Sequence, residues 1–357
     1  MKLAIFRRNF GNYSETFVKE NVQRVNDGRT VIVCHDVVGD CDWNGDRPIL
    51  VLGKYPVKLR VIILSIFLKR HNVKGCLIEF MDYAVKYRTV FERMKVPYVV
   101  LAHGYDIGRS LHRVKGYAEE VAKLKSALKV VVPCSYAKKL ILQKTKLGSS
   151  NIHVVPVGID LSKFESSNVE KDKNKAVFVG RFVEKKFPIL MLYSFYLAWQ
   201  KRPEIRLVCI GDGPLAPAAQ DFCRVMRFES AVEFKGVRDS KFVRNEIDSA
   251  RVLIQHSGTA GNRDIETMPL SAQEALSLGT PAVVSDHSGL PEIVDHDKNG
   301  FVVKEGNFDA MSERILEMFL MDEARYSSFQ DACLRKKPTF SLNHRLEYIN
   351  NLFAENG

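Results

Sequence analysis

The feature that most constrains the fold of this chain is a helix with a defined start and end that leads directly into a buried strand. Pro269 suits the first helical position, because its missing N–H would have no intrahelical partner there. Apolar residues then recur at helical spacing, and Gly279 and Pro281 end the helix. The apolar residues 282–284 follow at once, as in a strand buried on both faces. Helix, tight turn and buried strand together predict an α/β fold.

Two glutamates frame this unit: Glu266 precedes the helix and Glu274 lies within it. The first free N–H groups of the helix, at Leu270 and Ser271, point out of its positive end, which favours phosphate. Glu274 lies about 6 Å further along the axis, at a rise of ~1.5 Å per residue. It is therefore placed to accept hydrogen bonds from hydroxyls of a group attached to that phosphate. A bare pair of glutamates at this spacing is more often surface charge, and the helix between them strengthens the functional interpretation.

The whole run ETMPLSAQEALSLGTPAVVS, residues 266–285, resembles the signature of the family 4 glycosyltransferases. These are retaining enzymes with the GT-B fold, in which two Rossmann-like domains face each other across a cleft. The run is similar to the branch that builds bacterial exopolysaccharide, capsule and lipopolysaccharide. The resemblance implies that Glu274 binds the nucleotide ribose and that Glu266 lies beside the donor sugar.

A basic loop carries the resemblance further. Residues 176–179 predict a strand, and the following GRFVEKK resembles the G-R-x-x-x-x-K of the family. The resemblance implies that Arg181 and Lys186 bind the donor diphosphate, with Lys185 as an alternative to Lys186. Phe187 stands where the family usually has glycine, so a different loop shape is expected. The plain alternative is a solvated basic loop.

Residues 206–210 predict another strand, which ends in GDGP. This is not a complete G-x-G-x-x-G, so it does not indicate a dinucleotide site. It resembles the G-x-G-P turn of the family, which implies that Gly213 lies near the nucleotide. Pro269 stands where many relatives have glycine and removes one N–H donor, a substitution that also occurs in the exopolysaccharide branch.

In the first half of the chain, the predicted strand 98–101 delivers His103 and Asp106 at its carboxyl end. Ligands of open α/β sheets bind beyond the carboxyl ends of the strands. The tetrad HGYD resembles the H-G-x-D of the family, which implies that His103 contacts the donor sugar and Asp106 lies near the acceptor. Taken alone, a single histidine is more often a structural residue.

Two weaker segments agree with this resemblance. The run SETF at 14–17 resembles the opening of the exopolysaccharide branch, although Asn12 and Glu15 also fit a simple capping box. The run PVGID at 156–160 resembles the P-N-G-I-D that closes the first domain, with Val157 in place of the usual asparagine.

A chain of 357 residues is long enough for about two domains. The polar residues 165–175 indicate a linker between them. We therefore expect a basic, Rossmann-like, acceptor-binding domain at 1–165 and a Rossmann-like, nucleotide-sugar-binding domain at 166–338. Residues 339–357 are expected to form a helix that returns to the first domain, as in GT-B enzymes.

The seven cysteines are scattered, and none forms a C-x-x-C motif, as is typical of reduced thiols in the cytosol. No apolar run approaches the roughly 18 residues of a membrane span. We expect a cytoplasmic protein that is peripheral on the inner face of the membrane.

The net charge of +11 is concentrated in the first half. Residues 1–165 hold 28 Lys and Arg against 15 Asp and Glu, a balance of +13, and residues 166–357 hold 25 against 27, a balance of −2. This asymmetry fits a nucleic acid or an anionic membrane surface. The basic half has no recognisable nucleic-acid motif, whereas the basic, apolar segment 54–75 can lie in a membrane interface. A buried helix with solvated basic ends is the alternative for that segment.

The leading hypothesis is a retaining glycosyltransferase of the hexosyltransferase type. By resemblance it uses a UDP- or GDP-linked sugar, requires no metal, and transfers the sugar to a glycan or a lipid-linked acceptor in bacterial surface polysaccharide synthesis. No carboxylate is an obvious covalent nucleophile, and the two glutamates do not look like the acid and base of a hydrolase. The alternatives are a sugar-nucleotide epimerase with the same fold and a non-catalytic subunit that binds nucleotide or membrane.

Overall fold

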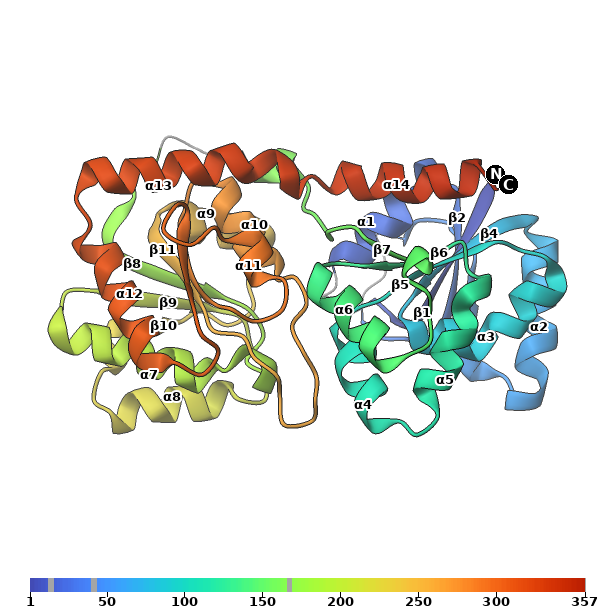
Figure 1. Cartoon of the computed structure of the whole chain (residues 1–357), viewed down its shortest axis with the longest axis horizontal. Coiled ribbons are helices and arrows are strands. Elements are labelled where there is room, and N and C mark those ends of the chain that lie inside the picture. The colour runs from blue at the N-terminus through green and yellow to red at the C-terminus, as the bar shows by residue number, and fades with distance from the viewer. Residues whose placement is uncertain (12–15, 40–43, 166–168, 357) are drawn as a thin grey trace. The chain divides into compact units, whose positions relative to one another are not determined.

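The computed structural model describes residues 1–11, 16–39, 44–165 and 169–356, with the backbone alone at 16–18. It divides the chain into two compact units (Figure 1). The first unit comprises Met1–Val157 and Asn343–Gly357, and the second comprises Gly158–Leu342. The SETF segment, with Asn12 and Glu15, lies mostly outside the described residues.

The first unit is built on a seven-stranded parallel sheet with the order β3-β2-β1-β4-β5-β6-β7. The strands are β1 (Lys2–Phe10), β2 (Thr30–Val37), β3 (Ile49–Val51), β4 (Val73–Glu79), β5 (Tyr98–Leu101), β6 (Lys129–Val132) and β7 (Ile152–Val154). The helices are α1 (Thr16–Arg24), α2 (Val57–Arg70), α3 (Met81–Met94), α4 (Leu111–Arg113), α5 (Tyr117–Ala122), α6 (Ser135–Lys144) and α14 (Leu342–Ala354).

The second unit is built on a six-stranded parallel sheet with the order β10-β9-β8-β11-β12-β13. The strands are β8 (Asp172–Val179), β9 (Arg206–Ile210), β10 (Val232–Phe234), β11 (Ala250–Gln255), β12 (Ala282–Ser285) and β13 (Gly300–Val303). The helices are α7 (Pro188–Lys201), α8 (Ala216–Val225), α9 (Ser240–Asp248), α10 (Leu270–Ser277), α11 (Leu290–Ile293), α12 (Phe308–Leu320) and α13 (Glu323–Lys336).

Both sheets are doubly wound, with helices on both faces (Figure 1). Strands enclosed in this way read as continuous apolar runs, because no face meets water. The runs at 98–101 and 206–210 accordingly form β5 and β9 with the expected bounds. The strand order reverses between β1 and β4 in the first sheet and between β8 and β11 in the second. Ligands of such sheets bind at this switch point, beyond the carboxyl ends of the strands.

The division between the units differs from the linker expected at 165–175. It falls after Val157, because the following residues pair within the second unit. Ile159 forms a parallel bridge with Ser341, and its N–H donates to the carbonyl of Phe340 at 2.8 Å. Gly158 has φ +71°, and a Cβ there would lie 2.8 Å from the backbone of Leu342. The polar residues from Asp172 onward begin β8.

The last helix, α14, packs on the first unit. Phe353 is fully buried against Gly75, where a Cβ would lie 2.7 Å from the Phe353 ring. The Tyr348 hydroxyl lies 2.7 Å from Nδ1 of His153, and the Asn350 side chain accepts from the N–H of Asn26 at 3.0 Å. In the described part of the chain, no helix combines the length and apolar character needed to cross a bilayer.

Candidate functional site

Helix α10 starts one residue later than expected. Pro269 has φ −65° and ψ 130°, so it is the N-cap, and Leu270 is the first helical residue. The prediction that Pro269 occupies the first helical position is therefore wrong, because the proline ring fixes φ but leaves ψ free to be extended. Among the described residues, no acceptor contacts the N–H groups of Leu270 and Ser271. These donors remain open at the positive end of the helix.

The side chain of Ser271 forms a hydrogen bond within the second unit. Its hydroxyl donates to Oε1 of Gln255 at 2.7 Å, and Nε2 of Gln255 donates to the hydroxyl of Ser257 at 3.0 Å. The N–H of Ser257 in turn donates to the hydroxyl of Ser285 at 2.9 Å. This series of hydrogen bonds fixes the start of α10 to the carboxyl ends of β11 and β12. Ser271 thus offers its backbone, rather than its hydroxyl, to a ligand.

The two predicted binding residues Lys186 and Glu266 contact each other. Nζ of Lys186 lies 2.9 Å from Oε2 of Glu266, and the two side chains are only 10% and 17% exposed. Burial would raise the pKa of Glu266, but the charges of Lys186 and then Lys185 outweigh it and bring the pKa to about 2. Glu266 is therefore ionised at neutral pH and cannot act there as a general acid.

Lys185 is directed to a different partner. Its Nζ lies 3.3 Å from Oδ1 of Asp264 and 3.2 Å from the carbonyl of Ile265. Two successive lysines thus attach the loop after β8 to the loop before α10. This engagement makes Lys185 a poorer alternative to Lys186 for a ligand.

Arg181, by contrast, is exposed directly after β8, and no acidic side chain in the described residues pairs with it. Burial lowers the pKa of Lys186, and the nearby positive charges of Lys185 and Arg181 contribute to this effect. A site that gathers cations in this way is favourable for a dianion. Arg181 is the cation that is most free to meet such a ligand.

Phe187 keeps the backbone that glycine would favour. It has φ 43° and ψ 48°, in the left-handed region that glycine favours. The ring packs over Gly258, where a Cβ would lie 2.4 Å from Cε2 of Phe187. The cost of this conformation is of order 1–2 kcal/mol for a non-glycine residue.

Gly213 belongs to a turn that packs against the same loop. It has φ +157°, and a Cβ there would lie 2.6 Å from the carbonyl oxygen of Phe182. Its N–H already donates to Oδ1 of Asp212 at 2.7 Å. Gly213 therefore allows the turn after β9 to approach the loop of Arg181, while its own N–H is occupied.

Glu274 has the most unusual electrostatic environment of the predicted residues. It lies one turn after Leu270, on the same face of α10. Burial raises the pKa of Glu274 to about 7, and the charge of Lys186 opposes this rise only in part. Within the described residues, its carboxyl group has no hydrogen-bond donor as a partner. A carboxyl group held in this way is ready to accept hydroxyl groups of a ligand.

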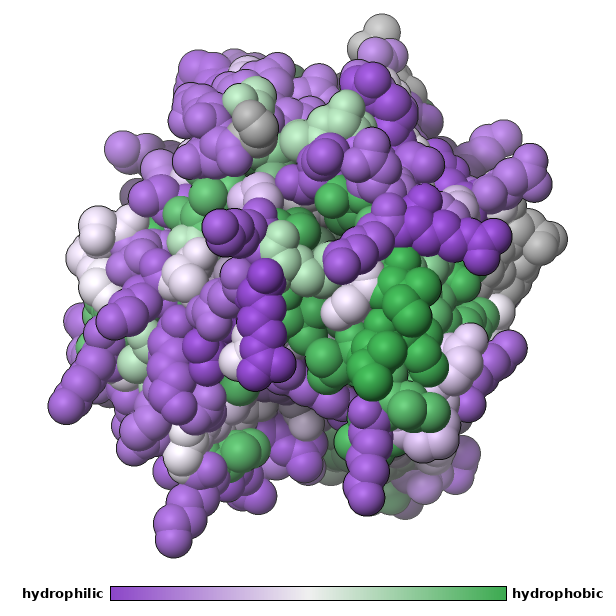
Figure 2. All heavy atoms as spheres, turned by 90° about the vertical axis from the view of Figure 1, so that its right-hand side faces the viewer, coloured by the Kyte–Doolittle hydropathy of each residue, from purple (hydrophilic) through white to green (hydrophobic). Residues whose placement is uncertain are grey.

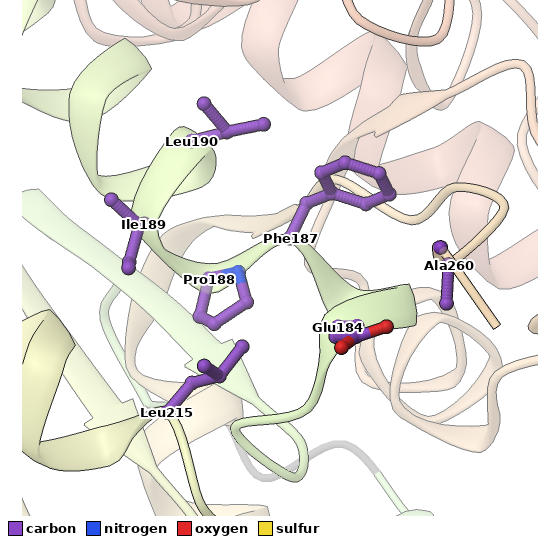
Figure 3. Close-up of a pocket in the computed structure, with 8 residues that line it drawn as sticks. Glu184, Phe187, Pro188, Ile189, Leu190, Leu215 and Ala260 are labelled. Carbon is purple, nitrogen blue, oxygen red and sulfur yellow. The ribbon is translucent and has the colours of Figure 1, made fainter.

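An apolar pocket of about 310 Å³ adjoins these loops. It is lined by Glu184, Phe187, Pro188, Ile189, Leu190, Leu215, Ala260 and Gly261 (Figure 3). Figure 3 shows Ile189 and Leu190 from the start of α7 and Ala260 from the loop after β11. Neither Arg181 nor Lys186 lines it, so the pocket suits an apolar group rather than a phosphate.

The sequence did not reveal the carboxylate that fixes the loop after β11. Oε1 of Glu305 accepts from the N–H of Thr259 at 2.9 Å, and Oε2 lies 2.8 Å from Nδ1 of His287. Glu305 comes 46 residues after Thr259. The order β11-β12-β13 in the sheet brings the loops after β11 and β13 together, and no local motif signals it.

In the first unit, His103 is held by a buried carboxylate. Nε2 of His103 lies 2.8 Å from Oε2 of Glu79, which is fully buried at the end of β4. Oε1 of Glu79 accepts from Nδ2 of Asn21 at 2.7 Å. Burial would raise the pKa of Glu79, but its hydrogen bond with His103 and nearby positive charges hold it below the usual value. Because the ionised carboxylate can only accept, Nε2 of His103 carries the proton and Nδ1 has the lone pair.

Asp106 is fully buried, and three backbone N–H groups occupy its carboxyl group. Oδ2 accepts from Met81 at 2.7 Å, and Oδ1 accepts from His103 at 2.8 Å and Ile107 at 3.1 Å. Burial raises the pKa of Asp106 well above its usual value. This geometry favours a role in shaping the loop of His103 over the direct role near the acceptor that the motif implies.

Backbone strain lies beside His103. Phe80 has φ 77° and ψ 133°, a conformation that is rare for any residue except glycine. Its ring lies 4.5 Å from the His103 ring, and the guanidinium of Arg7 lies 5.4 Å from the centre of the Phe80 ring. Such strain is concentrated at functional sites. It marks the ends of β4 and β5 as the candidate site of this unit.

Two doubly wound α/β units define the class of protein, because solved structures with the GT-B fold match almost the whole chain. HepE of Anabaena, in complex with UDP, covers 99% of this chain with a TM-score of 0.83 and 15% identity, over 100% of its own chain. The lipopolysaccharide outer core galactosyltransferase WaaB, in its apo form, covers 100% of both chains with a TM-score of 0.75 and 16% identity. The chain has the GT-B fold.

The second unit also matches a family model. Residues 161–331, just under half of the chain, match the model "Glycosyl transferases group 1". WcaL of Escherichia coli K12, which is named for colanic acid biosynthesis, is 28% identical over 222 residues, 62% of this chain and 54% of WcaL. The amylovoran biosynthesis glycosyltransferase AmsK of Erwinia amylovora is 25% identical over 222 residues, with the same coverage. The chain spans about half the length of these curated relatives.

Proposed function

We propose that this protein transfers a sugar from a nucleotide-diphosphate donor to a glycan or lipid-linked acceptor in bacterial surface polysaccharide synthesis. The observation that carries the proposal is the grouping of Arg181, Lys186, Glu266 and Glu274 around the start of α10. Cations, open helix N–H groups and a hydroxyl-accepting carboxyl group are together the chemistry that a nucleoside diphosphate requires.

In the proposed reaction, Arg181, Lys186 and the N–H groups of Leu270 and Ser271 hold the diphosphate. Glu274 accepts the ribose hydroxyls. The bond between the anomeric carbon and the phosphate oxygen breaks, and the cations stabilise the charge that develops on the leaving group. The acceptor oxygen bonds to the anomeric carbon, and its proton passes to the leaving phosphate on the same face of the sugar. The configuration of the anomeric carbon is therefore retained.

Glu266 and His103 complete the assignment. Glu266 stays ionised beside Lys186, so we assign it to the donor sugar as a hydrogen-bond acceptor rather than as an acid. We keep His103 as the candidate of the first unit, because Glu79 fixes the orientation and the proton of its ring. The donor carries UDP or GDP, the sugar is a hexose, and no metal is required. The protein would act in the cytoplasm, on the inner face of the membrane, with no nucleic acid as a partner.

The test is the release of nucleoside diphosphate from UDP-glucose, UDP-galactose and GDP-mannose by the purified protein, followed by NMR of the product at the anomeric carbon. We expect release from one donor class, retention in the product, and loss of release in Glu266→Gln. Glu313→Gln, on the exposed face of α12, is the matched control. Conversion of the donor into its epimer would support the epimerase instead, and binding without turnover would support the non-catalytic subunit.

A further inference from the structure

The outward face of α2 is apolar. Only Leu64 and Leu68 of this helix are buried, where it packs on β4 and α3. Leu59, Ile62 and Ile66 are 46%, 56% and 59% exposed. Tyr55, Val57 and Val61 add to the exposed apolar surface. Figure 2 shows a green apolar patch bordered by hydrophilic side chains on the face where α2 lies.

Helix geometry places these residues together. Leu59, Ile62 and Ile66 are spaced by three and four residues, so they share one face, opposite Leu64 and Leu68. A helix on the surface of a soluble domain normally has a polar outer face. Helix α2 is instead apolar on both its inner and its outer sides, although only the inner side packs against other elements of the first unit. Contiguous exposed apolar surface of this kind marks an interaction site.

Positive charge borders this face. Residues 54–78 contain six cations, namely Lys54, Lys58, Arg60, Lys69, Arg70 and Lys74, and no Asp or Glu. All of these cations except Arg60 are exposed. Neighbouring elements add two further cations, Arg8 of β1 and Lys86 of α3. Burial lowers the pKa of Lys86, and the nearby charges of Arg60 and Arg8 lower it further.

We propose that the outward face of α2 is a docking surface for an anionic lipid bilayer. The helix would lie in the plane of the interface, with Leu59, Ile62 and Ile66 among the upper acyl chains and the lysines extended to the headgroups. A second copy of this chain fits less well, because a symmetric contact would bring the two sets of cations together. The proposal is independent of the sugar-transfer chemistry of the second unit.

The experiment is co-sedimentation of the full chain with vesicles of phosphatidylcholine, with and without one third phosphatidylglycerol. The apolar variant is Ile62→Asn with Ile66→Asn, and its control is Val225→Asn, which changes a residue of the second unit that is 77% exposed. The charge variant is Lys58→Gln with Lys69→Gln, and its control is Lys201→Gln with Lys241→Gln, two exposed lysines of the second unit.

We expect the unchanged chain and both controls to sediment with the anionic vesicles and to stay in solution with the neutral ones. The apolar variant should bind at least about tenfold more weakly. Each lysine removed from the charge variant should weaken binding about fivefold, the equivalent of ~1 kcal/mol per cation at an anionic surface. Thermal unfolding of each variant verifies that it is folded.

Three results would overturn the proposal: no binding to anionic vesicles, equal binding to both kinds of vesicle, or unchanged binding of the apolar variant. A dimer in light scattering that the apolar variant dissociates would assign the face to a second copy. Binding of UDP to the same samples reports on the second unit alone. If the unchanged chain does not bind UDP, that result contradicts the proposed function without bearing on α2.

Discussion

Nζ of Lys186 lies 2.9 Å from Oε2 of Glu266, so two residues expected to meet different parts of one ligand contact each other. The contact joins the loop after β8 to the loop before α10. A ligand phosphate that approaches Lys186 therefore meets a cation that is already positioned, and this lowers the cost of ordering it on binding.

The Lys186–Glu266 pair should make stability depend on acid. Because the pKa of Glu266 is about 2 in the folded chain against 4.5 as the ordinary value, its stabilising effect is present above the unfolded pKa. This stabilisation is lost as the pH falls through the pKa of Glu266 in the folded chain, between about pH 5 and pH 2. The full effect is roughly 3 kcal/mol. Urea unfolding across this range should show the loss in the unchanged chain and a flatter profile in Glu266→Gln. An equal slope in both would contradict this account of the pair.

Replacing Lys186 alone should lower the free energy of unfolding more than replacing both members of the pair. Lys186→Met leaves the buried carboxylate without its partner, which we expect to cost about 3 kcal/mol of unfolding free energy. Adding Glu266→Gln removes the orphaned charge and should recover most of this loss. A double variant that is less stable than Lys186→Met would show that the two side chains do not form a coupled pair.

Binding of UDP should strengthen as the pH rises through about 7, where Glu274 ionises. Only about a tenth of the group is ionised at pH 6 and about nine tenths at pH 8, so affinity should rise about tenfold, since the ionised carboxylate is the better acceptor. Calorimetric titration at the two pH values measures this. Glu274→Gln should remove the part of the pH dependence that the ionisation of UDP does not explain. If the variant keeps the full dependence, Glu274 does not accept the ribose.

Glu79→Gln should impair turnover through His103. The loss of the charge lowers the pKa of His103 further, because Glu79 now raises it against the effect of burial. The limb of the pH–rate profile that reports His103 should therefore move to lower pH. The value of kcat should fall about tenfold to hundredfold, the range seen for partners that orient functional imidazoles. Glu92→Gln, on the exposed side of α3, is the control. A fall in kcat without any shift of the profile would point to a purely structural role.

Gly213→Ala should destabilise the second unit by about 3 kcal/mol, since a Cβ would overlap the carbonyl of Phe182 at a strained φ. Gly236→Ala is the matched control. It also has a positive φ, +64°, but nothing lies within 4 Å of its Cβ position, so it should cost only about 1 kcal/mol. Thermal unfolding of the two variants separates the close approach from the backbone conformation. Equal losses would show that the packing of the two loops does not require glycine.

The elements that were predictable from the sequence are those whose signal is local. The strands at 98–101 and 206–210 are apolar because both of their faces are covered, and their bounds agree with β5 and β9. The helix after Pro269 was also predictable, but not its N-cap, because the proline ring fixes φ and leaves ψ free.

The contacts that tune the site were not predictable in this way. Glu79 meets His103, 24 residues further along, only because β4 and β5 are neighbours in the sheet, and Glu305 meets Thr259 across 46 residues. The apolar run of α2 was compatible with burial as well as exposure. Only the packing shows that Ile62 and Ile66 face outward.

The most direct test of the central claim is calorimetric titration of UDP and GDP into the full chain and into Arg181→Ala, with Arg224→Ala as the control. Arg224 is exposed on α8 and pairs with Asp221. We expect one of the two nucleotides to bind the unchanged chain and the control equally well. Binding to Arg181→Ala should be at least about tenfold weaker, as the loss of one charge-assisted phosphate contact implies. Absence of binding by both nucleotides, or equal binding by Arg181→Ala, would contradict a diphosphate site at the start of α10.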